Sequence, residues 1–176
     1  MKVNVFLDRD GTLIEDVGYI ASSNDVRPLP GVFEGLQLFK RNHYRLHVIS
    51  NQSGLARGKF TREEFEEVQA RFIKIFSERD IVFDTLNYCF HLPTEECSCR
   101  KPKPGLFEKV NSENQIDKLL SAMIGNSDAD RGAAEAFGIP YWDVRTLVED
   151  DLAKDTFEVL SSHVVEYFNG VQHELE

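Results

Sequence analysis

Short apolar runs rich in β-branched and aromatic residues alternate along the chain with longer segments of helical periodicity. Strands that alternate with helices predict βαβ units, and therefore a mostly parallel sheet with helices on both faces. The expected strands are residues 2–8, 44–50, 81–90 (broken at Asp84), 119–126 and 139–144. The expected helices are residues 31–42, 61–79, 105–113, 129–138 and 156–168. The pattern predicts an α/β fold of the doubly wound, Rossmann-like type.

The segment 61–79 carries the strongest helical signal. Thr61 and Glu64 have the spacing of a capping box, in which two side chains satisfy free N–H groups at the start of a helix. Apolar residues then recur every three or four positions and form one face: Phe65, Val68, Phe72 and Phe76. Elsewhere the acidic residues 148–155 predict a surface loop, and residues 169–176 predict a frayed end.

Length and charge favour one compact domain without a general affinity for nucleic acid or membranes. The 176 residues suit a single domain spanning residues 1–176 with a hydrophobic core. The formal net charge of −10 argues against a general affinity for nucleic acid or anionic membranes. No apolar run approaches the length of a membrane span, and the first residues lack the order of a secretion signal. We therefore expect a cytoplasmic monomer without a nucleic-acid or membrane partner.

Polar residues stand where the predicted strands end. Asp8 and Asp10 follow the first strand, Ser50 and Asn51 follow the second, and the basic run 100–103 precedes a helix. Three more polar residues follow the fourth strand: Asn126, Asp128 and Asp130. The carboxyl ends of parallel strands meet at the edge where such sheets bind ligands. One carboxylate could simply turn the chain, but carboxylates, a hydroxyl and an ammonium group on one edge favour a functional site.

This set of groups suits phosphoryl transfer. The reaction needs a nucleophile in line with phosphorus, a cation on the non-bridging oxygens and a proton donor for the leaving oxygen. Asp8 could be the nucleophile and form an aspartyl phosphate, and Asp10 could protonate the leaving group and then activate water. Mg²⁺ prefers oxygen ligands and takes one or two carboxylates. Ser50 and Lys101 could hold the phosphate, because a lysine ammonium is a compact charge suited to it.

Four segments resemble, in order, the four motifs of the haloacid-dehalogenase-like phosphatases: FLDRDGT, VISNQSGLARG, CRKPKPG and IGNSDADRGAA. The resemblance implies that Asp8 is the nucleophile and Asp10 the general acid/base. It also implies that Ser50 and Lys101 hold the phosphate, and that Asp8 and the Asp10 carbonyl bind Mg²⁺. We further expect four residues near these motifs to contact the substrate: Arg9, Asn51, Arg57 and Arg100. One helix and a loop fill the interval from Asp8 to Ser50, which leaves no room there for a large cap domain.

The fourth motif departs from the family pattern. The family usually begins this motif with Gly-Asp, and that aspartate binds Mg²⁺ directly, whereas this chain has Asn126 at the position. The amide oxygen can still bind Mg²⁺ but brings no charge, so the metal affinity should fall. Asp130 matches the second acid of the motif, a supporting residue, and Asp128 could compensate through a shift of the loop. We expect a working enzyme, with a catalytically weakened, zinc-stabilised binding module as the alternative.

All three cysteines lie in one short segment, CFHLPTEECSC. Four residues there offer three thiolates and an imidazole: Cys89, His91, Cys97 and Cys99. Zn²⁺ binds such sets tetrahedrally in closed structural sites, which leave no open position for a substrate. We therefore expect a structural zinc loop at residues 89–99, which orders the backbone ahead of Lys101. The same loop occurs in the histidinol-phosphate and heptose-bisphosphate phosphatases, so the resemblance narrows to this group.

Different segments point to different substrates within this group. NQSGLARGKF, which contains Arg57, and DVGY, which contains Tyr19, resemble the heptose-bisphosphate 7-phosphatases. Arg57 and Arg100 could then bind a second phosphate, because a guanidinium binds phosphate bidentately. The segment HLPTEECSCRKPK instead resembles the histidinol-phosphate enzymes. We expect D-glycero-D-manno-heptose 1,7-bisphosphate as the substrate, and histidinol phosphate, an amino-alcohol phosphate, is the alternative.

Overall fold

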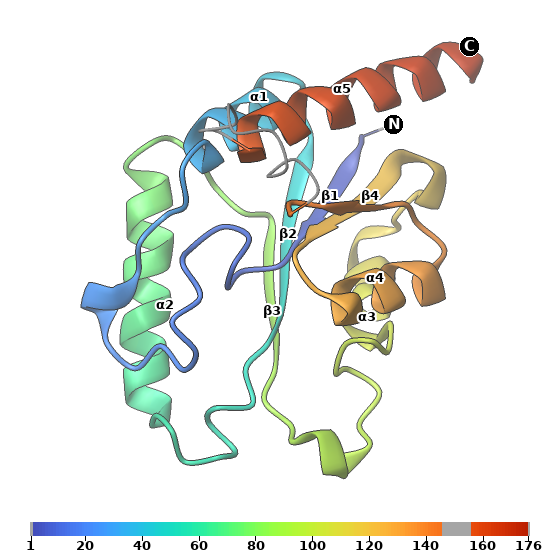
Figure 1. Ribbon diagram of the computed structural model, residues 1–176. Coiled ribbons are helices and arrows are strands. Elements are labelled where there is room, and N and C mark those ends of the chain that lie inside the picture. The colour runs from blue at the N-terminus through green and yellow to red at the C-terminus, as the bar shows by residue number, and fades with distance from the viewer. Residues whose placement is uncertain (1, 146–155, 176) are drawn as a thin grey trace.

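The computed structural model describes residues 2–145 and 156–175 (Figure 1). Within these residues, five parallel strands form one sheet in the order β3-β2-β1-β4-β5. The strands are β1 (Asn4–Leu7), β2 (Arg45–Asn51), β3 (Thr85–Cys89), β4 (Ser121–Gly125) and β5 (Tyr141–Asp143). The chain winds outward from β1 to β3 and then returns to add β4 and β5 on the other side of β1. The strand order therefore reverses next to β1, which is where ligands bind in doubly wound sheets.

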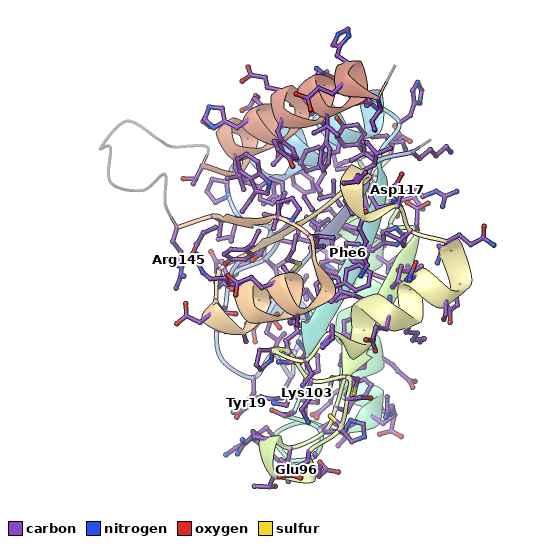
Figure 2. The ribbon with its side chains drawn as sticks, turned by 90° about the vertical axis from the view of Figure 1, so that its right-hand side faces the viewer. Phe6, Tyr19, Glu96, Lys103, Asp117 and Arg145 are labelled. Atoms are coloured by element: carbon purple, nitrogen blue, oxygen red, sulfur yellow. The ribbon has the colours of Figure 1, made fainter. Side chains whose placement is uncertain are left out.

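Helices cover both faces of the sheet, as the sequence predicts. They are α1 (Val32–Arg41), α2 (Arg62–Ser77), α3 (Gly105–Asn114), α4 (Asp128–Phe137) and α5 (Thr156–Glu174). Figure 1 shows α2 on one side of the sheet and α3 and α4 on the other. Successive side chains of β1 enter opposite cores: Val5 and Leu7 pack with residues of α1, α2 and α5, whereas Phe6 packs with residues of α3 and α4 (Figure 2). This alternation follows from the two-residue period of a strand, and the predicted fold class is confirmed.

Capping boxes begin helices α2 and α4. At α2, the Thr61 hydroxyl accepts the N–H of Glu64 (3.1 Å) and the Glu64 carboxylate accepts the N–H of Thr61 (2.7 Å), as predicted. At α4, Ser127 and Asp130 form the same reciprocal pair, with distances of 3.2 and 3.1 Å. Each pair satisfies two N–H groups that a helix start otherwise leaves free. The α4 pair holds the chain directly after Asn126.

The elements differ most clearly from the sequence prediction at three places. β3 begins at Thr85 and not at residue 81, because the Asp84 carboxylate accepts the N–H of Leu46 (2.9 Å) and turns the chain into the sheet. β4 begins at Ser121, after a short 3₁₀ turn at Lys118–Leu120. The frayed end predicted for residues 169–176 is wrong for residues 169–174: α5 runs to Glu174, and Val171 near its end still packs on the core.

The acidic loop predicted at residues 148–155 lies outside the described residues. None of the helices in the described part of the chain combines the length and the apolar character that crossing a membrane requires.

Candidate active site

A polar cleft of about 250 Å³ lies at the carboxyl ends of the strands, beside the point where the strand order reverses. It is lined by Asp8, Asp10, Asp16, Gly18, Ser50, Asn51, Lys101, Asn126, Ser127, Ala129 and Asp130. The lining comes from three strand ends and from the loop that follows the cysteines. The structure thus brings together the polar groups that the strand ends were expected to deliver, apart from Asp128, whose side chain points into solvent and is 96% exposed.

Lys101 lies between two buried carboxylates. Its Nζ is 2.7 Å from Oδ1 of Asp8 and 2.5 Å from Oδ1 of Asp130, and it donates to the carbonyl of Ile49 at 2.8 Å. Burial raises the pKa of Asp8 to about 7, although the nearby Lys101 ammonium opposes this shift. Burial alone would lower the pKa of Lys101, but Asp8 and Asp130 outweigh it and raise that pKa. Lys101 therefore stays charged in the cleft, as a phosphate-binding residue must.

Asp10 is held by two neighbouring side chains. Arg9 donates to both of its carboxylate oxygens, from Nε and Nη2, at 3.0 Å each. Gln52 donates to Oδ2 of Asp10 at 2.5 Å and also lies 2.9 Å from the Ser50 hydroxyl. Sequence reasoning placed Arg9 at the substrate and missed Gln52, whose only signal was its place just after a strand end. The inward position of Arg9, which is 1% exposed, favours a role in holding Asp10 over contact with the substrate.

The other predicted substrate contacts occupy three different places. Asn51 lines the cleft, but its amide accepts the N–H of Lys101 (3.1 Å) and donates to the Lys101 carbonyl (3.0 Å), so it ties β2 to the loop after the cysteines. Arg57 is exposed in the turns that follow β2. Arg100 lines a neighbouring cavity of about 180 Å³, together with Lys101 and Lys103. Figure 2 shows Lys103 and Tyr19 at the same end of the molecule.

The loop after β4 closely approaches the loop that follows β1. A Cβ added at Gly11 would lie 2.0 Å from the amide nitrogen of Asn126, and Gly11 has a φ of +75°, so a side chain there would strain the backbone and displace the Asn126 amide. Asp130 supports this loop: its Oδ2 accepts the N–H groups of Asn126 (3.2 Å) and Ser127 (3.1 Å) and the Ser127 hydroxyl (2.6 Å). With its other oxygen on Lys101, Asp130 is placed to support the site and not to bind a metal itself.

The cleft has the donor set that Mg²⁺ prefers. The Asp8 carboxylate, the Asp10 carbonyl and the Asn126 amide would all bring oxygen atoms to one ion, and Mg²⁺ takes one or two carboxylates together with water and substrate phosphates. The close approach of Asn126 to Gly11 brings the amide side chain to the backbone next to Asp10. These residues therefore fit the ion, with Asp130 behind them.

The cysteine loop brings together a second donor set of a different kind. The ligand atoms of Cys89, His91, Cys97 and Cys99 all lie within 4.8 Å of one another, and the sulfur–sulfur distances are 3.2, 3.5 and 3.7 Å. A tetrahedron with Zn–S bonds of about 2.3 Å has edges of roughly 3.8 Å. Burial raises the pKa of Cys89, and burial together with the neighbouring thiols raises the pKa of Cys99 to about 12. A bound cation would hold these sulfurs as thiolates, so the cluster suits a structural Zn²⁺.

Side chains on the loop connect this cluster to the cleft. Arg100 donates to the carbonyl of His91 (3.3 Å), and Lys103 donates to the carbonyl of Glu96 (2.9 Å) at the tip of the loop (Figure 2). Lys101 lies between these two residues in the chain. The folding of the cysteine loop and the position of the Lys101 ammonium are therefore linked through the backbone.

The chain matches the polynucleotide kinase 3 phosphatase family over residues 2–142. It belongs to this phosphatase family. It is 40% identical over 145 residues to the D-glycero-beta-D-manno-heptose-1,7-bisphosphate 7-phosphatase of Vibrio cholerae, with 78% of each chain covered. The enzyme of the same name from Helicobacter pylori is 40% identical over 127 residues, which cover 72% of this chain and 73% of the relative.

Solved structures agree with this family assignment. The D,D-heptose 1,7-bisphosphate phosphatase of B. bronchiseptica, solved with magnesium and phosphate, superposes with a TM-score of 0.82 and 25% identity over 95% of this chain and 99% of that one. A putative haloacid-dehalogenase-like phosphatase from Mesorhizobium loti shares the fold, with a TM-score of 0.73 and 24% identity over 90% of this chain and 87% of that one. The resemblance to the haloacid-dehalogenase-like phosphatases is therefore confirmed for this phosphatase.

Proposed function

We propose that this protein is a Mg²⁺-dependent phosphatase that removes the 7-phosphate of D-glycero-D-manno-heptose 1,7-bisphosphate through an aspartyl-phosphate intermediate. The observation that carries the proposal is the buried pairing of Asp8 with Lys101, next to an Asp10 carboxylate that faces the same cleft. The names of the relatives that are about 40% identical over most of the chain supply the substrate.

In the first step, an oxygen of the Asp8 carboxylate attacks phosphorus and forms a P–O bond while the bond from phosphorus to the sugar oxygen breaks. Lys101 holds Oδ1 of Asp8 at 2.7 Å, which orients the carboxylate and places a positive charge beside the transferred group. The Ser50 hydroxyl, which is buried at the rim, donates to a phosphate oxygen. Protonated Asp10 gives its proton to the leaving sugar oxygen, so that an alcohol departs and not an alkoxide.

In the second step, the Asp10 carboxylate takes a proton from a water molecule, and the water oxygen attacks phosphorus. The P–O bond to Asp8 breaks, which returns the Asp8 carboxylate and releases inorganic phosphate. When bound at Asp8, the Asp10 carbonyl and Asn126, Mg²⁺ would neutralise the non-bridging phosphate oxygens. The burial that raises the pKa of Asp8 to about 7 also disfavours its charged form, so the positive charges of Lys101 and the ion both assist its ionisation.

The positive charge for a second phosphate has to be local, since the chain as a whole carries −10. Arg100 lines the cavity next to the cleft, beside Lys101 and Lys103. Arg57 is exposed in the turns after β2, where it could contact the remote phosphate of a bound sugar. We assign the 1-phosphate to these two arginines and expect the protein to work as a cytoplasmic monomer, without a nucleic-acid or membrane partner.

The test is steady-state phosphate release in Mg²⁺, with heptose 1,7-bisphosphate and histidinol phosphate as substrates. We expect a kcat/KM for the bisphosphate at least about tenfold higher, no turnover in Asp8→Asn, and a raised KM with little change in kcat in Arg100→Gln. A preference for histidinol phosphate would replace the proposed substrate and favour the similarity of the cysteine segment to the histidinol enzymes. No turnover of either substrate, with activity restored in Asn126→Asp, would instead support a weakened module with a binding role.

A further inference from the structure

Arg9 is a buried cation to which the reaction described above assigns no role. Its side chain is 1% exposed, and its guanidinium carbon lies 5.9 Å from the ring centre of Phe65 and 5.8 Å from that of Tyr88. The two rings meet edge to face at 5.1 Å and come from α2 and β3. The Tyr88 hydroxyl in turn donates to Gln69 of α2 at 2.5 Å. The guanidinium is therefore fixed by the body of the fold and not by the cleft.

The fixed guanidinium points its fork at Asp10. Nε and Nη2 each lie 3.0 Å from a different carboxylate oxygen, the bidentate geometry that adds orientation as well as energy to an ion pair. Gln52, which is 5% exposed, adds a third bond to Oδ2 and reaches the Ser50 hydroxyl with the same amide nitrogen. The three bonds fix the plane of the carboxylate. The Asp10 side chain is 17% exposed and can still reach the cleft.

Stability alone does not account for this arrangement. Burying an ion pair costs desolvation energy that its attraction often fails to repay, and apolar residues of similar size are often as stable or more so. Within residues 2–145 and 156–175, Nη1 of Arg9 has no hydrogen-bond partner, which adds to that cost. The position of Arg9 costs stability, and its guanidinium contacts the proposed general acid/base. The orientation that it gives to the Asp10 carboxylate accounts for this position.

We propose that Arg9, assisted by Gln52, is a positioning residue that orients the Asp10 carboxylate for proton transfer. This inference rests on the proposed function, because it needs Asp10 to be the general acid/base. Arg9 touches neither the substrate nor the transferred phosphate. It holds Asp10 in line with the leaving oxygen in the first step and with the attacking water in the second, where a misplacement of about 1 Å can cost about 100-fold in rate.

The test uses p-nitrophenyl phosphate, whose leaving group needs no proton in the first step. In Arg9→Met, which keeps the apolar stem between the two rings, we expect a rapid burst of p-nitrophenolate at a rate within about threefold of wild type. Steady-state turnover should fall about 10- to 100-fold, because the second step still needs Asp10, and phosphoenzyme should accumulate. An alkyl phosphate should show no burst, since its first step depends on Asp10 as well. Arg9→Lys should not restore turnover, because an ammonium lacks the fork.

Arg62→Met is the matched control. This arginine also lies over an aromatic ring, with its guanidinium carbon 4.5 Å from the ring centre of Phe90, but within the described residues it has no hydrogen bond or ion pair to Asp10. It should behave like wild type. Equal losses of burst rate and turnover in Arg9→Met, or full activity in Arg9→Lys, would overturn the positioning role. If wild type releases no phosphate from heptose 1,7-bisphosphate, the proposed function fails. If wild type is active and Arg9→Met matches it, only the present inference fails.

Discussion

Replacing Lys101 by methionine removes the cation between the buried carboxylates of Asp8 and Asp130. Both lie within 2.7 Å of Nζ, and the three residues are between 1% and 8% exposed. Breaking a buried ion pair by removing one partner typically costs about 3–5 kcal/mol, because the remaining charge is left without compensation. We therefore expect Lys101→Met to lower the free energy of unfolding by about that amount near pH 8, and to abolish phosphate release.

The loss should depend on pH. Burial already raises the pKa of Asp8 to about 7 while Lys101 opposes it, so without Lys101 the pKa of Asp8 in the folded protein rises further above its unfolded value of about 3.9. A folded state that binds more protons than the unfolded one loses stability as the pH rises. The variant should thus be least stable above the folded pKa of Asp8 and should come closer to wild type near pH 5, where protonation neutralises the Asp8 carboxyl beside the methionine.

The measurement is urea unfolding of both proteins near pH 8 and near pH 5, followed by circular dichroism in buffer without Mg²⁺. Lys103→Met is the control, because Lys103 is exposed and close in the chain, and its ammonium donates to the Glu96 carbonyl and pairs with no carboxylate within residues 2–145 and 156–175. It should cost less than about 1 kcal/mol at either pH. An equal loss at both pH values in Lys101→Met, or no loss near pH 8, would refute the placement of the ammonium between two charged carboxylates.

Three further predictions concern other sites. Burial lowers the pKa of His47 to about 4, so between about pH 6.5 and 4 the unfolded chain binds a proton that the folded chain does not. The free energy of unfolding should therefore fall by up to about 3 kcal/mol as the pH drops through that window. The fall should be smaller in His47→Gln, as acid titration of both proteins would show. Asn126→Asp adds a charged ligand and should tighten Mg²⁺ binding about tenfold or more by calorimetry; unchanged affinity would place the ion elsewhere. Cys97→Ser should lower the zinc content measured by metal analysis and, in the same protein, the thermal midpoint; a full complement of zinc would exclude the proposed ligand set.

The positions of the elements could be read from the sequence because their signals are local. The capping box at Thr61 and the apolar stripe of α2 depend on residues within a few turns of one another, and both are present in the structure. The predicted bounds were wrong where contacts with distant segments determine the start or the end of an element. Asp84 ends a β-rich run by bonding to Leu46 across the sheet, and Val171 extends α5 by packing on the core. Neither contact has a signature in the neighbouring sequence.

Residue types and spacing in the sequence already indicate which groups reach the edge of the sheet, Asp8, Asp10, Lys101 and Asn126, and which four residues form the cysteine cluster. How these groups pair is visible only in the folded chain. Lys101 meets Asp8 across 93 positions of chain, and Arg9, next to two predicted catalytic residues, turns inward between the rings of Phe65 and Tyr88. The physical reason is that a residue type sets what a side chain can bond to, whereas burial and the approach of distant segments set which partner it finds and how strongly it binds it.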